Sequence, residues 1–292
     1  MKCIFGHYIK YLYFYLKNKK HENYNWTHMP SHVLMIKTVQ IAPFRTLMVA
    51  LKDILLETNI TFEKDGIRII NMDKSQTILV NMHLSAENFE YYECNKEKII
   101  VGVNMLHFFK LINSIDNDET LSIYIEDRDY NQGIVEYLNL KFENKNIKQC
   151  KIQKLKLIEP DQEELSVPDV PFSSIIHMPA SDFQKIIRDL NNISDKLEIK
   201  SVHNQLFFKC DGPFANAEIV RSESDGMGFT QKNHSIIQGE FSLKNLNYFI
   251  KCTNLCNHIE MYLANDLPLI VKYNVASLGT IKLGLAPIPC AE

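Results

Sequence analysis

Seven basic residues of this sequence recur at spacings that would group them on the faces of helices. Arg45 and Lys52 are seven residues apart, so in a helix they lie on one face, two turns apart. Lys185 and Arg188 are three residues apart and also share a face. Cations placed in this way can contact the phosphate groups of a nucleic acid backbone. The complete set of candidates is Arg45, Lys52, Lys110, Lys185, Arg188, Lys244 and Lys251.

The helices that would position these cations are amphipathic. Leu47, Leu51 and Ile54 form an apolar face that would pack onto a sheet. The four predicted helices carry seven basic and four acidic residues, a balance of +3, so the rest of this chain of net charge −3 sums to −6. Such segregation favours phosphate contact at one surface, although amphipathic helices also carry charges that are only solvated. No aromatic stacking platform accompanies the cations, so any DNA binding should be directed at the backbone and independent of base sequence.

The overall composition is that of a globular protein, with 46% hydrophobic and 23% charged residues. A chain of 292 residues can bury a core without disulfides or metal. Its seven cysteines are odd in number and scattered, which predicts free thiols in a reducing compartment. Cys252, Cys256 and His258 form the one tight cluster, but no fourth ligand stands nearby, so we expect no metal site.

Two parts of the chain carry the same pattern. Residues 103–110 and 241–248 each open with an apolar residue and a candidate helix N-cap, Asn104 or Ser242. Each helical pattern leads into an alternating strand, and the copies lie 138 residues apart. An upstream match has an offset of 136, as small loop insertions would produce. Residues 36–150 and 172–290 therefore read as two copies of one α+β unit, each with two helices and antiparallel strands joined by tight turns such as Lys64-Asp65-Gly66.

The domain organisation follows from this repeat. We expect an N-terminal extension over residues 1–35, a first domain over 36–157, a connector over 158–171 and a second domain over 172–292. Residues 159–171 contain three prolines and five acidic residues, which is typical of an extended linker rather than a central strand or helix.

The N-terminal extension has an apolar, aromatic run over residues 3–16, followed by basic residues 17–20. The run is too short to span a bilayer and lacks the order of charges of a signal peptide. We expect a loosely ordered appendage, or sequence upstream of a true start at Met29 or Met35. An interfacial helix or a partner-binding tail is the alternative.

Several segments resemble, in order and spacing, the sliding clamps of the proliferating cell nuclear antigen family. The likeness runs from about residue 36 to 288, and the extension and divergence make the chain similar to a large-DNA-virus form, such as the clamp-like protein of African swine fever virus. The segments are Asn71–Leu79 (NMDKSQTIL), Leu157–Pro168 (LIEPDQEELSVP), Met178-Pro179 with Phe183 and Arg188-Asp189-Leu190, Pro268–Tyr273 (PLIVKY) and Leu285-Ala286-Pro287.

The resemblance implies a DNA clamp fold and a non-enzymatic processivity factor. Three copies would form a ring around double-stranded DNA, and the seven basic residues would contact phosphate without reading sequence. DNA polymerase and other replication or repair enzymes would insert a peptide under the connector, with no cofactor, catalytic residue, metal or membrane partner. We expect an intracellular protein, in the host cytoplasm at a viral replication site or in the nucleus. The implied peptide pocket is Met72, Gln76, Thr77, Leu79, Leu165, Val167, Pro268, Ala286 and Pro287.

The sequence departs from this family at several positions. Gly284 stands where the family often has a bulky aromatic residue, which predicts a wider or shallower pocket. Thr77 replaces a branched apolar residue and Gln76 replaces a histidine. Asn113 and Asn192 fall where relatives often carry basic groups, which predicts a less positive channel.

Two candidate strands have opposite charge. Residues 145–156 carry five lysines on a predicted edge strand, and residues 214–225 carry Glu218, Glu223 and Asp225. Pairing of these edges between copies would steer assembly and fix register. Alternatively, the lysines only discourage aggregation at an exposed edge.

Other functions find less support in the sequence. Residues 225–228 (DGMG) lack the lysine and the following helix of a phosphate-binding loop, so the sequence does not favour an enzyme. Two alternatives keep the fold: a monomeric processivity factor that binds DNA on an open basic face, and a protein-binding scaffold without DNA contact.

Overall fold

The computed structural model describes residues 31–161, 165–168, 170–231 and 236–289. The apolar and basic N-terminal segment lies outside the described residues. The chain divides into residues 1–31 and 32–292, and the fold below is that of the second unit. Its first strand begins at His32, four residues before the predicted boundary, because Val33 and Leu34 are buried in the core. No helix in the described part of the chain is long and apolar enough to cross a membrane.

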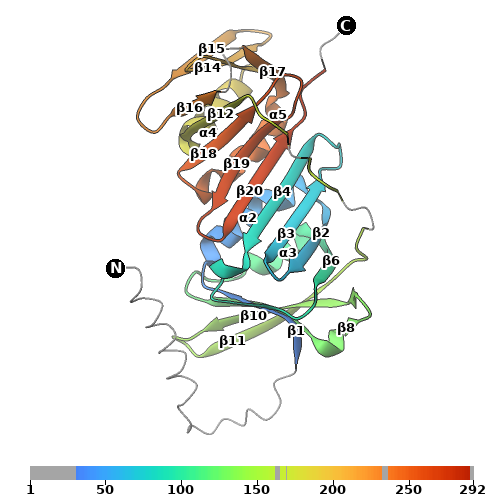
Figure 1. Ribbon diagram of the computed structural model, residues 1–292. Helices are drawn as coiled ribbons and strands as arrows, with labels where there is room; N and C mark the ends of the chain where they lie inside the picture. Colours follow the sequence, from blue (N-terminus) through green and yellow to red (C-terminus); the bar gives the residue numbers. More distant parts are fainter. Residues whose placement is uncertain (1–30, 162–164, 169, 232–235, 290–292) are drawn as a thin grey trace, which may run out of the picture. The chain divides into compact units, whose positions relative to one another are not determined.

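The first repeat is built mainly of antiparallel strands with two α-helices (Figure 1). Its elements are β1 (His32–Thr38), α2 (Ile41–Ile54), β2 (Glu57–Glu63), β3 (Gly66–Met72), β4 (Ile78–Ser85), β5 (Tyr91–Cys94), β6 (Lys98–Asn104), α3 (Met105–Ile112), β7 (Thr120–Glu126), β8 (Tyr130–Asn131), β9 (Ile134–Val135), β10 (Tyr137–Asn144) and β11 (Gln149–Lys156).

The second repeat has the same order of strands and helices, apart from the short hairpin β8–β9, which it lacks. Its elements are β12 (Ser174–Pro179), α4 (Ala180–Asn191), β13 (Lys196–Val202), β14 (Gln205–Asp211), β15 (Asn216–Ser222), β16 (Gly228–Gln231), β17 (Ile237–Ser242), α5 (Leu243–Phe249), the 3₁₀ helix η3 (Ile250–Leu255), β18 (His258–Leu263), β19 (Leu269–Val275) and β20 (Gly279–Leu285).

The strands of both repeats pair in the same topology. In the first repeat one group has the order β11-β10-β7-β1-β5 and the other the order β4-β3-β2-β6. In the second repeat the corresponding groups have the orders β20-β19-β18-β12-β16 and β15-β14-β13-β17. The two repeats join because β20 pairs with β4, which makes one nine-stranded sheet of two of these groups. The predicted α+β architecture of two similar antiparallel domains with two helices each is therefore confirmed.

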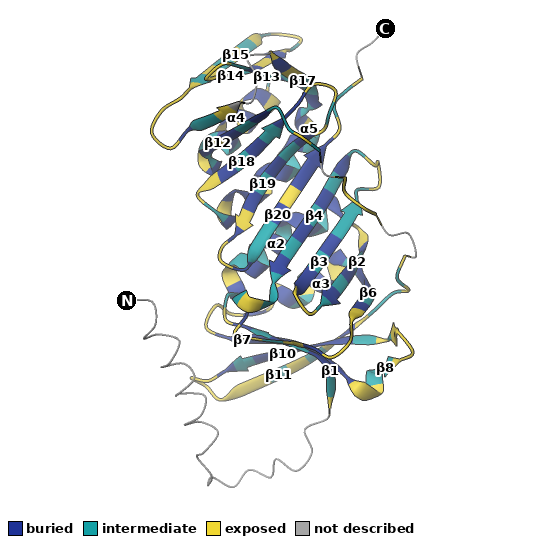
Figure 2. Ribbon diagram, viewed as in Figure 1, coloured by how far each residue is buried: buried dark blue, intermediate teal, exposed yellow. Residues whose placement is uncertain are grey.

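The strand pairs alternate between a buried and a half-exposed face. Along β4, every second residue from Ile78 to Leu84 is buried, while Leu79 and Asn81 face the other side (Figure 2). The predicted turn before β3 requires its glycine: Gly66 has φ of +147°, and a Cβ there would lie 2.0 Å from the carbonyl oxygen of Leu84. The period-two pattern thus separates a core face from an outer face across the whole sheet.

The helices begin and pack as their sequences predict. The side chain of Asn104 accepts a hydrogen bond from the backbone N–H of His107 at 3.1 Å and caps α3. In the same way, the hydroxyl of Ser242 accepts from the backbone N–H of Asn245 at 3.3 Å and caps α5. The apolar face of α2, including Leu47 and Leu51, is fully buried. Each such leucine contributes about 1.5–3 kcal/mol when it is removed from water.

One helix is shorter than the charge spacing predicts. We expected Lys244 and Lys251 on one continuous helical face, but α5 ends at Phe249 and Lys251 lies in η3. The carbonyl oxygen of Ile250 accepts hydrogen bonds from two side chains, the Thr253 hydroxyl at 2.6 Å and Gln184 Nε2 at 3.3 Å. Its hydrogen bonds therefore belong to the 3₁₀ helix η3 and not to a continuation of α5 with regular α-helical hydrogen bonds.

Candidate functional site

The four α-helices form one contiguous layer behind the nine-stranded sheet (Figure 1). Helix α2 of the first repeat contacts α3, and also α5 and η3 of the second repeat. Helix α4 contacts α5 and η3. The predicted basic residues from the two repeats therefore lie on neighbouring helices of a single layer.

Five of the seven predicted cations are exposed on this layer, namely Lys251, which is paired with Asp53, and four others. None of the four has an acidic partner within 4 Å in the part of the chain that the structure describes. Asn113 and Asn192 end α3 and α4 and are exposed, so they add no cation. The four exposed cations without an acidic partner are Lys110, Lys185, Arg188 and Lys244.

Lys52 and Lys251 share one carboxylate, that of Asp53. Lys52 Nζ lies 2.6 Å from Asp53 Oδ1, and Lys251 Nζ pairs with Oδ2 of the same group. The two ammonium groups also lie over aromatic rings, at 5.0 Å from the Phe109 centroid and 5.3 Å from that of Tyr248. Burial acts to raise the pKa of Asp53, but hydrogen bonds from the two lysines outweigh it and the net pKa is lowered. This cluster joins α2 to η3, hence one repeat to the other.

Arg45 is engaged within its own repeat. Its Nη1 donates to Asn117 Oδ1 at 3.0 Å and its Nη2 donates to the carbonyl oxygen of Ile115, both in the loop after α3. The side chain is half-buried rather than extended into solvent. Its role in phosphate contact stays a prediction.

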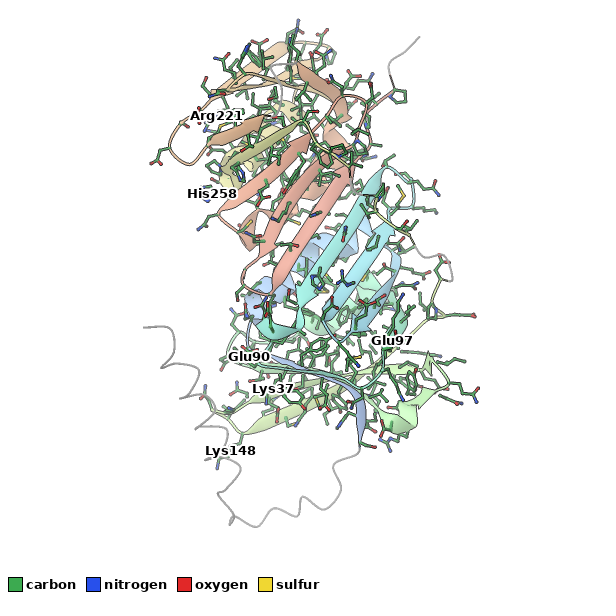
Figure 3. All side chains as sticks on the ribbon, in the orientation of Figure 1. Lys37, Glu90, Glu97, Lys148, Arg221 and His258 are labelled. Atoms are coloured by element: carbon green, nitrogen blue, oxygen red, sulfur yellow. The ribbon has the colours of Figure 1, made fainter. Side chains whose placement is uncertain are left out.

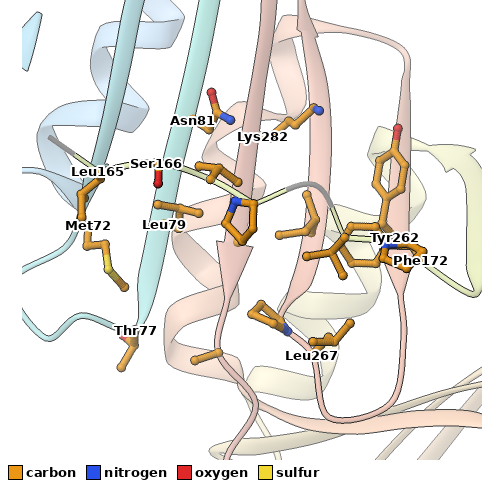
Figure 4. A pocket seen from close by; sticks show the side chains of 18 of the residues that line it. Met72, Thr77, Leu79, Asn81, Leu165, Ser166, Phe172, Tyr262, Leu267 and Lys282 are labelled. Atoms are coloured by element: carbon orange, nitrogen blue, oxygen red, sulfur yellow. The ribbon is translucent and has the colours of Figure 1, made fainter.

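A cavity of about 790 Å³ lies under the connector, on the face of the nine-stranded sheet opposite the helices (Figure 4). Residues 165–168 and 170–172 form one wall, and strands from both repeats form the floor. The structure brings seven of the nine predicted pocket residues to it. These are Met72, Thr77, Leu79, Leu165, Val167, Pro268 and Ala286.

Two predicted pocket residues do not line this cavity. Gln76 has a left-handed backbone (φ of 55°) and an exposed side chain in the turn between β3 and β4. Pro287 follows β20 where the chain leaves the sheet, and the next residue, Ile288, donates its N–H to the carbonyl oxygen of Glu240 at 2.8 Å. Each is the direct neighbour of a lining residue, Thr77 or Ala286, but does not itself line the cavity.

The turn that carries Thr77 is held by Asp73. Its carboxylate accepts from the backbone N–H groups of Ser75, Thr77 and Ile78 at 3.1, 2.8 and 2.6 Å. Burial acts to raise the pKa of Asp73, but the hydrogen bonds from Ser75, Ile78 and Thr77 lower it overall. This fixed turn positions one end of the cavity.

Most residues of the floor and of the far wall were not predicted from the sequence. The signal available was strand alternation, because floor residues occupy every second position of strands whose other face is core. Lys282 is the one charged side chain among the described lining residues. Gly284, which the sequence already connected with the width of the pocket, also lines the cavity. The lining residues that were not predicted are Asn81, Ser166, Pro168, Val170, Pro171, Phe172, Ile175, Tyr262, Leu267, Ile270 and Lys282.

The two oppositely charged segments both provide sheet edges. Strand β11 is an edge of the five-stranded sheet and β15 is an edge of the four-stranded sheet. Figure 3 labels Lys148 in the turn before β11 and Arg221 on β15, far apart in the unit formed by residues 32–292. Large apolar side chains are exposed beside the charges, with Ile152 on β11 and Val220 on β15.

The cysteine and histidine cluster does not form a metal centre in the described chain. Cys252 is fully buried in η3, and burial raises the pKa of its thiol to about 12. Cys256 donates from sulfur to the carbonyl oxygen of His258 at 3.1 Å. Among the residues that the structure describes, no three His, Cys, Asp or Glu side chains are grouped to hold a metal ion.

Comparisons with known proteins identify the family. The family model described as "Proliferating cell nuclear antigen, N-terminal domain" matches residues 33–164, and that for the C-terminal domain matches residues 166–288. The chain is 34% identical over 258 residues to a "Probable DNA polymerase sliding clamp 1" of Paramecium bursaria Chlorella virus 1, covering 87% of this chain and 96% of that protein.

A second viral relative spans a longer chain. The "Probable DNA polymerase sliding clamp" of Acanthamoeba polyphaga mimivirus is 36% identical over 224 residues, which cover 76% of this chain and 47% of that protein. The two family models thus match both repeats in order and over nearly their full length. This chain belongs to the proliferating cell nuclear antigen family of sliding clamps, which are non-catalytic processivity factors.

Proposed function

We propose that three copies of this chain close head to tail into a ring around duplex DNA and tether DNA polymerase and other replication or repair enzymes to it. The viral relatives are named as sliding clamps of DNA polymerase. The observation that carries the proposal is the pairing of β20 with β4 inside the chain.

The internal junction provides a template for a junction between copies. In the common topology of the repeats, β20 corresponds to β11 and β4 corresponds to β15. The strands β20 and β4 pair antiparallel along their whole length, whereas β11 and β15 each end a sheet. Pairing of β11 of one copy with β15 of the next would repeat the internal junction. Because each copy has one edge of each kind, the contact is heterologous and can close a ring.

Charge on the two edges supports this pairing. Lys154 and Lys156 are exposed on β11, and Glu218 is exposed on β15. Opposite charges on pairing edges speed encounter and disfavour pairing of like edges. Exposed Ile152 and Val220 would become buried in the same contact.

The helix layer supports passage of DNA on the side away from the sheet. Lys110, Lys185, Arg188 and Lys244 are exposed there without an acidic partner within 4 Å in the described chain, so they are free to contact phosphate. The cavity lies on the opposite face of the sheet, so a docked partner would not compete with DNA. We infer that it receives a short apolar segment of the partner enzyme, at a viral replication site in the host cytoplasm or nucleus.

The mass of the protein in solution at physiological salt tests the ring directly. We expect about three times the chain mass of 34.0 kDa by light scattering or sedimentation, independent of DNA. A mass of one chain across the working concentration range would contradict the ring and leave a clamp fold that acts as a monomer.

A further inference from the structure

The floor of the cavity is a single row of residues that face one another across six strands. Strand register pairs each member with the next: Ile175 with Tyr262, Tyr262 with Ile270, Ile270 with Gly284, Gly284 with Leu79, and Leu79 with Met72. Five members carry large side chains, and Gly284, near the centre, has none. All six line the cavity (Figure 4).

Gly284 leaves the centre of this row without a side chain. A Cβ at this position would lie 2.9 Å from Ile270 Cδ1 and 3.4 Å from Leu79 Cβ. The space above the glycine is therefore bounded by Ile270 and Leu79, and a large substituent there would push aside the flexible end of Ile270. An apolar side chain of an occupant can enter this gap in the row when the flexible end of Ile270 moves aside.

The next row along the strands is polar and has unbalanced charge. In it, Glu260 faces Lys272, Lys272 faces Lys282, and Lys282 faces Asn81. Lys272 Nζ donates to Glu260 at 3.0 Å, and the Tyr262 hydroxyl donates to the same carboxylate. Lys282 is exposed and has no acidic partner within 4 Å among the described residues. Two ammonium groups therefore lie on directly opposed residues, and the one carboxylate, that of Glu260, lies on the far side of Lys272 from Lys282.

We propose that the segment bound in this cavity carries an acidic side chain beside its apolar anchor, and that Lys282 selects for it. This inference rests on the proposed use of the cavity for partner docking. Gly284 and Lys282 are two residues apart on β20 and face the same side, so the anchor and the acid would be about 7 Å apart. A carboxylate there would pair with Lys282 and relieve its repulsion from Lys272, whereas a basic side chain would face both lysines.

Selection from a random peptide library displayed on phage tests the proposal. The targets are the wild-type protein, Lys282→Glu, Gly284→Trp, and Lys64→Glu, which makes the same charge change at an exposed lysine outside the cavity. Wild type and Lys64→Glu should enrich peptides with an acidic residue near an apolar anchor. Lys282→Glu should enrich a basic residue at that position.

Binding constants of one selected peptide then distinguish the use of the cavity for docking from the selectivity of Lys282. Replacing its acidic residue by lysine should weaken binding to wild type by about five- to tenfold, and this loss should vanish or reverse on Lys282→Glu. Peptides that bind Gly284→Trp as tightly as wild type do not place an anchor over Gly284, which would overturn the proposed docking mode and this inference together. Two outcomes would overturn only the role of Lys282. In both, Gly284→Trp abolishes peptide binding, but the selected peptides either show no preference for an acidic residue or keep that preference on Lys282→Glu.

Discussion

At the scale of single residues, Asp53 decides how many cations the helix layer can offer to DNA. Its carboxylate binds both Lys52 and Lys251, so these two ammonium groups are already neutralised in part. A phosphate group would have to compete with this internal acceptor. The number of phosphate contacts is therefore smaller than the number of basic residues that the sequence places on the helices.

Replacing Asp53 by asparagine should strengthen duplex binding. The amide keeps the shape of the side chain but removes the charge, which frees Lys52 and Lys251 for phosphate. The slope of log affinity against log salt should become steeper by up to about 1.8, or 0.9 for each added contact. Fluorescence anisotropy with a short linear duplex over a series of salt concentrations measures it, and an unchanged slope would show that these lysines do not reach DNA.

The same substitution has a signature in stability against pH. The pKa of Asp53 is lowered in the folded protein, so its ion pairs stabilise the fold above the usual aspartate range. This contribution is lost as pH falls through the folded pKa. Thermal unfolding should therefore show wild type more stable than Asp53→Asn near neutral pH, with the difference shrinking under acid conditions. A difference that grows as pH falls would contradict this assignment.

Single residues also show where sequence reasoning stops. The sequence predicted that Lys251 shares a helical face with Lys244, which holds only if α5 continues past Phe249. The hydrogen bonds from Thr253 and Gln184 to the Ile250 carbonyl accompany the end of α5, and the spacing of residues does not reveal them. Likewise, Gln76 was assigned to the pocket by resemblance, but its left-handed backbone depends on the Asp73 turn. Such local backbone changes depend on tertiary partners that periodicity does not encode.

At the scale of elements, the edge strands β11 and β15 carry the proposed assembly. Lys154→Glu with Lys156→Glu should make both pairing edges acidic, because Glu218 lies on β15 and Glu223 follows it, and should raise the dissociation constant of the ring by at least about 100-fold. Adding Glu218→Lys and Glu223→Lys to the same chain should restore assembly, because the charges are opposite again. Sedimentation of both variants measures this, and a first variant that assembles like wild type would place the interface elsewhere.

The helix layer permits a matched test of DNA contact. Lys185→Ala, Arg188→Ala and Lys244→Ala together remove three exposed cations, so the salt slope of duplex binding should fall by up to about 2.7. Lys64→Ala, Lys74→Ala and Lys209→Ala remove the same charge from exposed positions away from the helices and should leave it unchanged. Equal effects of the two sets would mean that binding follows net charge and not the helix layer.

Elements were the part of the structure that the sequence predicted best. Helix caps and strand alternation are local signals. They therefore located the helix starts at Asn104 and Ser242 and the two charged edge segments. The far half of the cavity floor could not be predicted, because Ile175, Tyr262 and Ile270 join Met72 and Leu79 only through the register of strands distant in sequence.

At the scale of the whole molecule, the two repeats account for both the fold and the proposed ring. The internal repeat was visible in the sequence and predicted two similar domains. Their junction through β20 and β4, and the correspondence of these strands to the free edges β11 and β15, became apparent only from the sheet order. One pairing geometry used within and between copies is the simplest route from this topology to a closed assembly.

Topological retention on DNA tests the central claim most directly. The protein is incubated with a linear duplex biotinylated at both ends, the ends are then blocked with streptavidin, and the sample is washed at a salt concentration that abolishes binding to a short duplex. An encircling ring should remain on the blocked duplex and leave when the duplex is cut between the blocks. Release from blocked DNA at the same rate as from open DNA, or retention after the cut, would contradict encirclement.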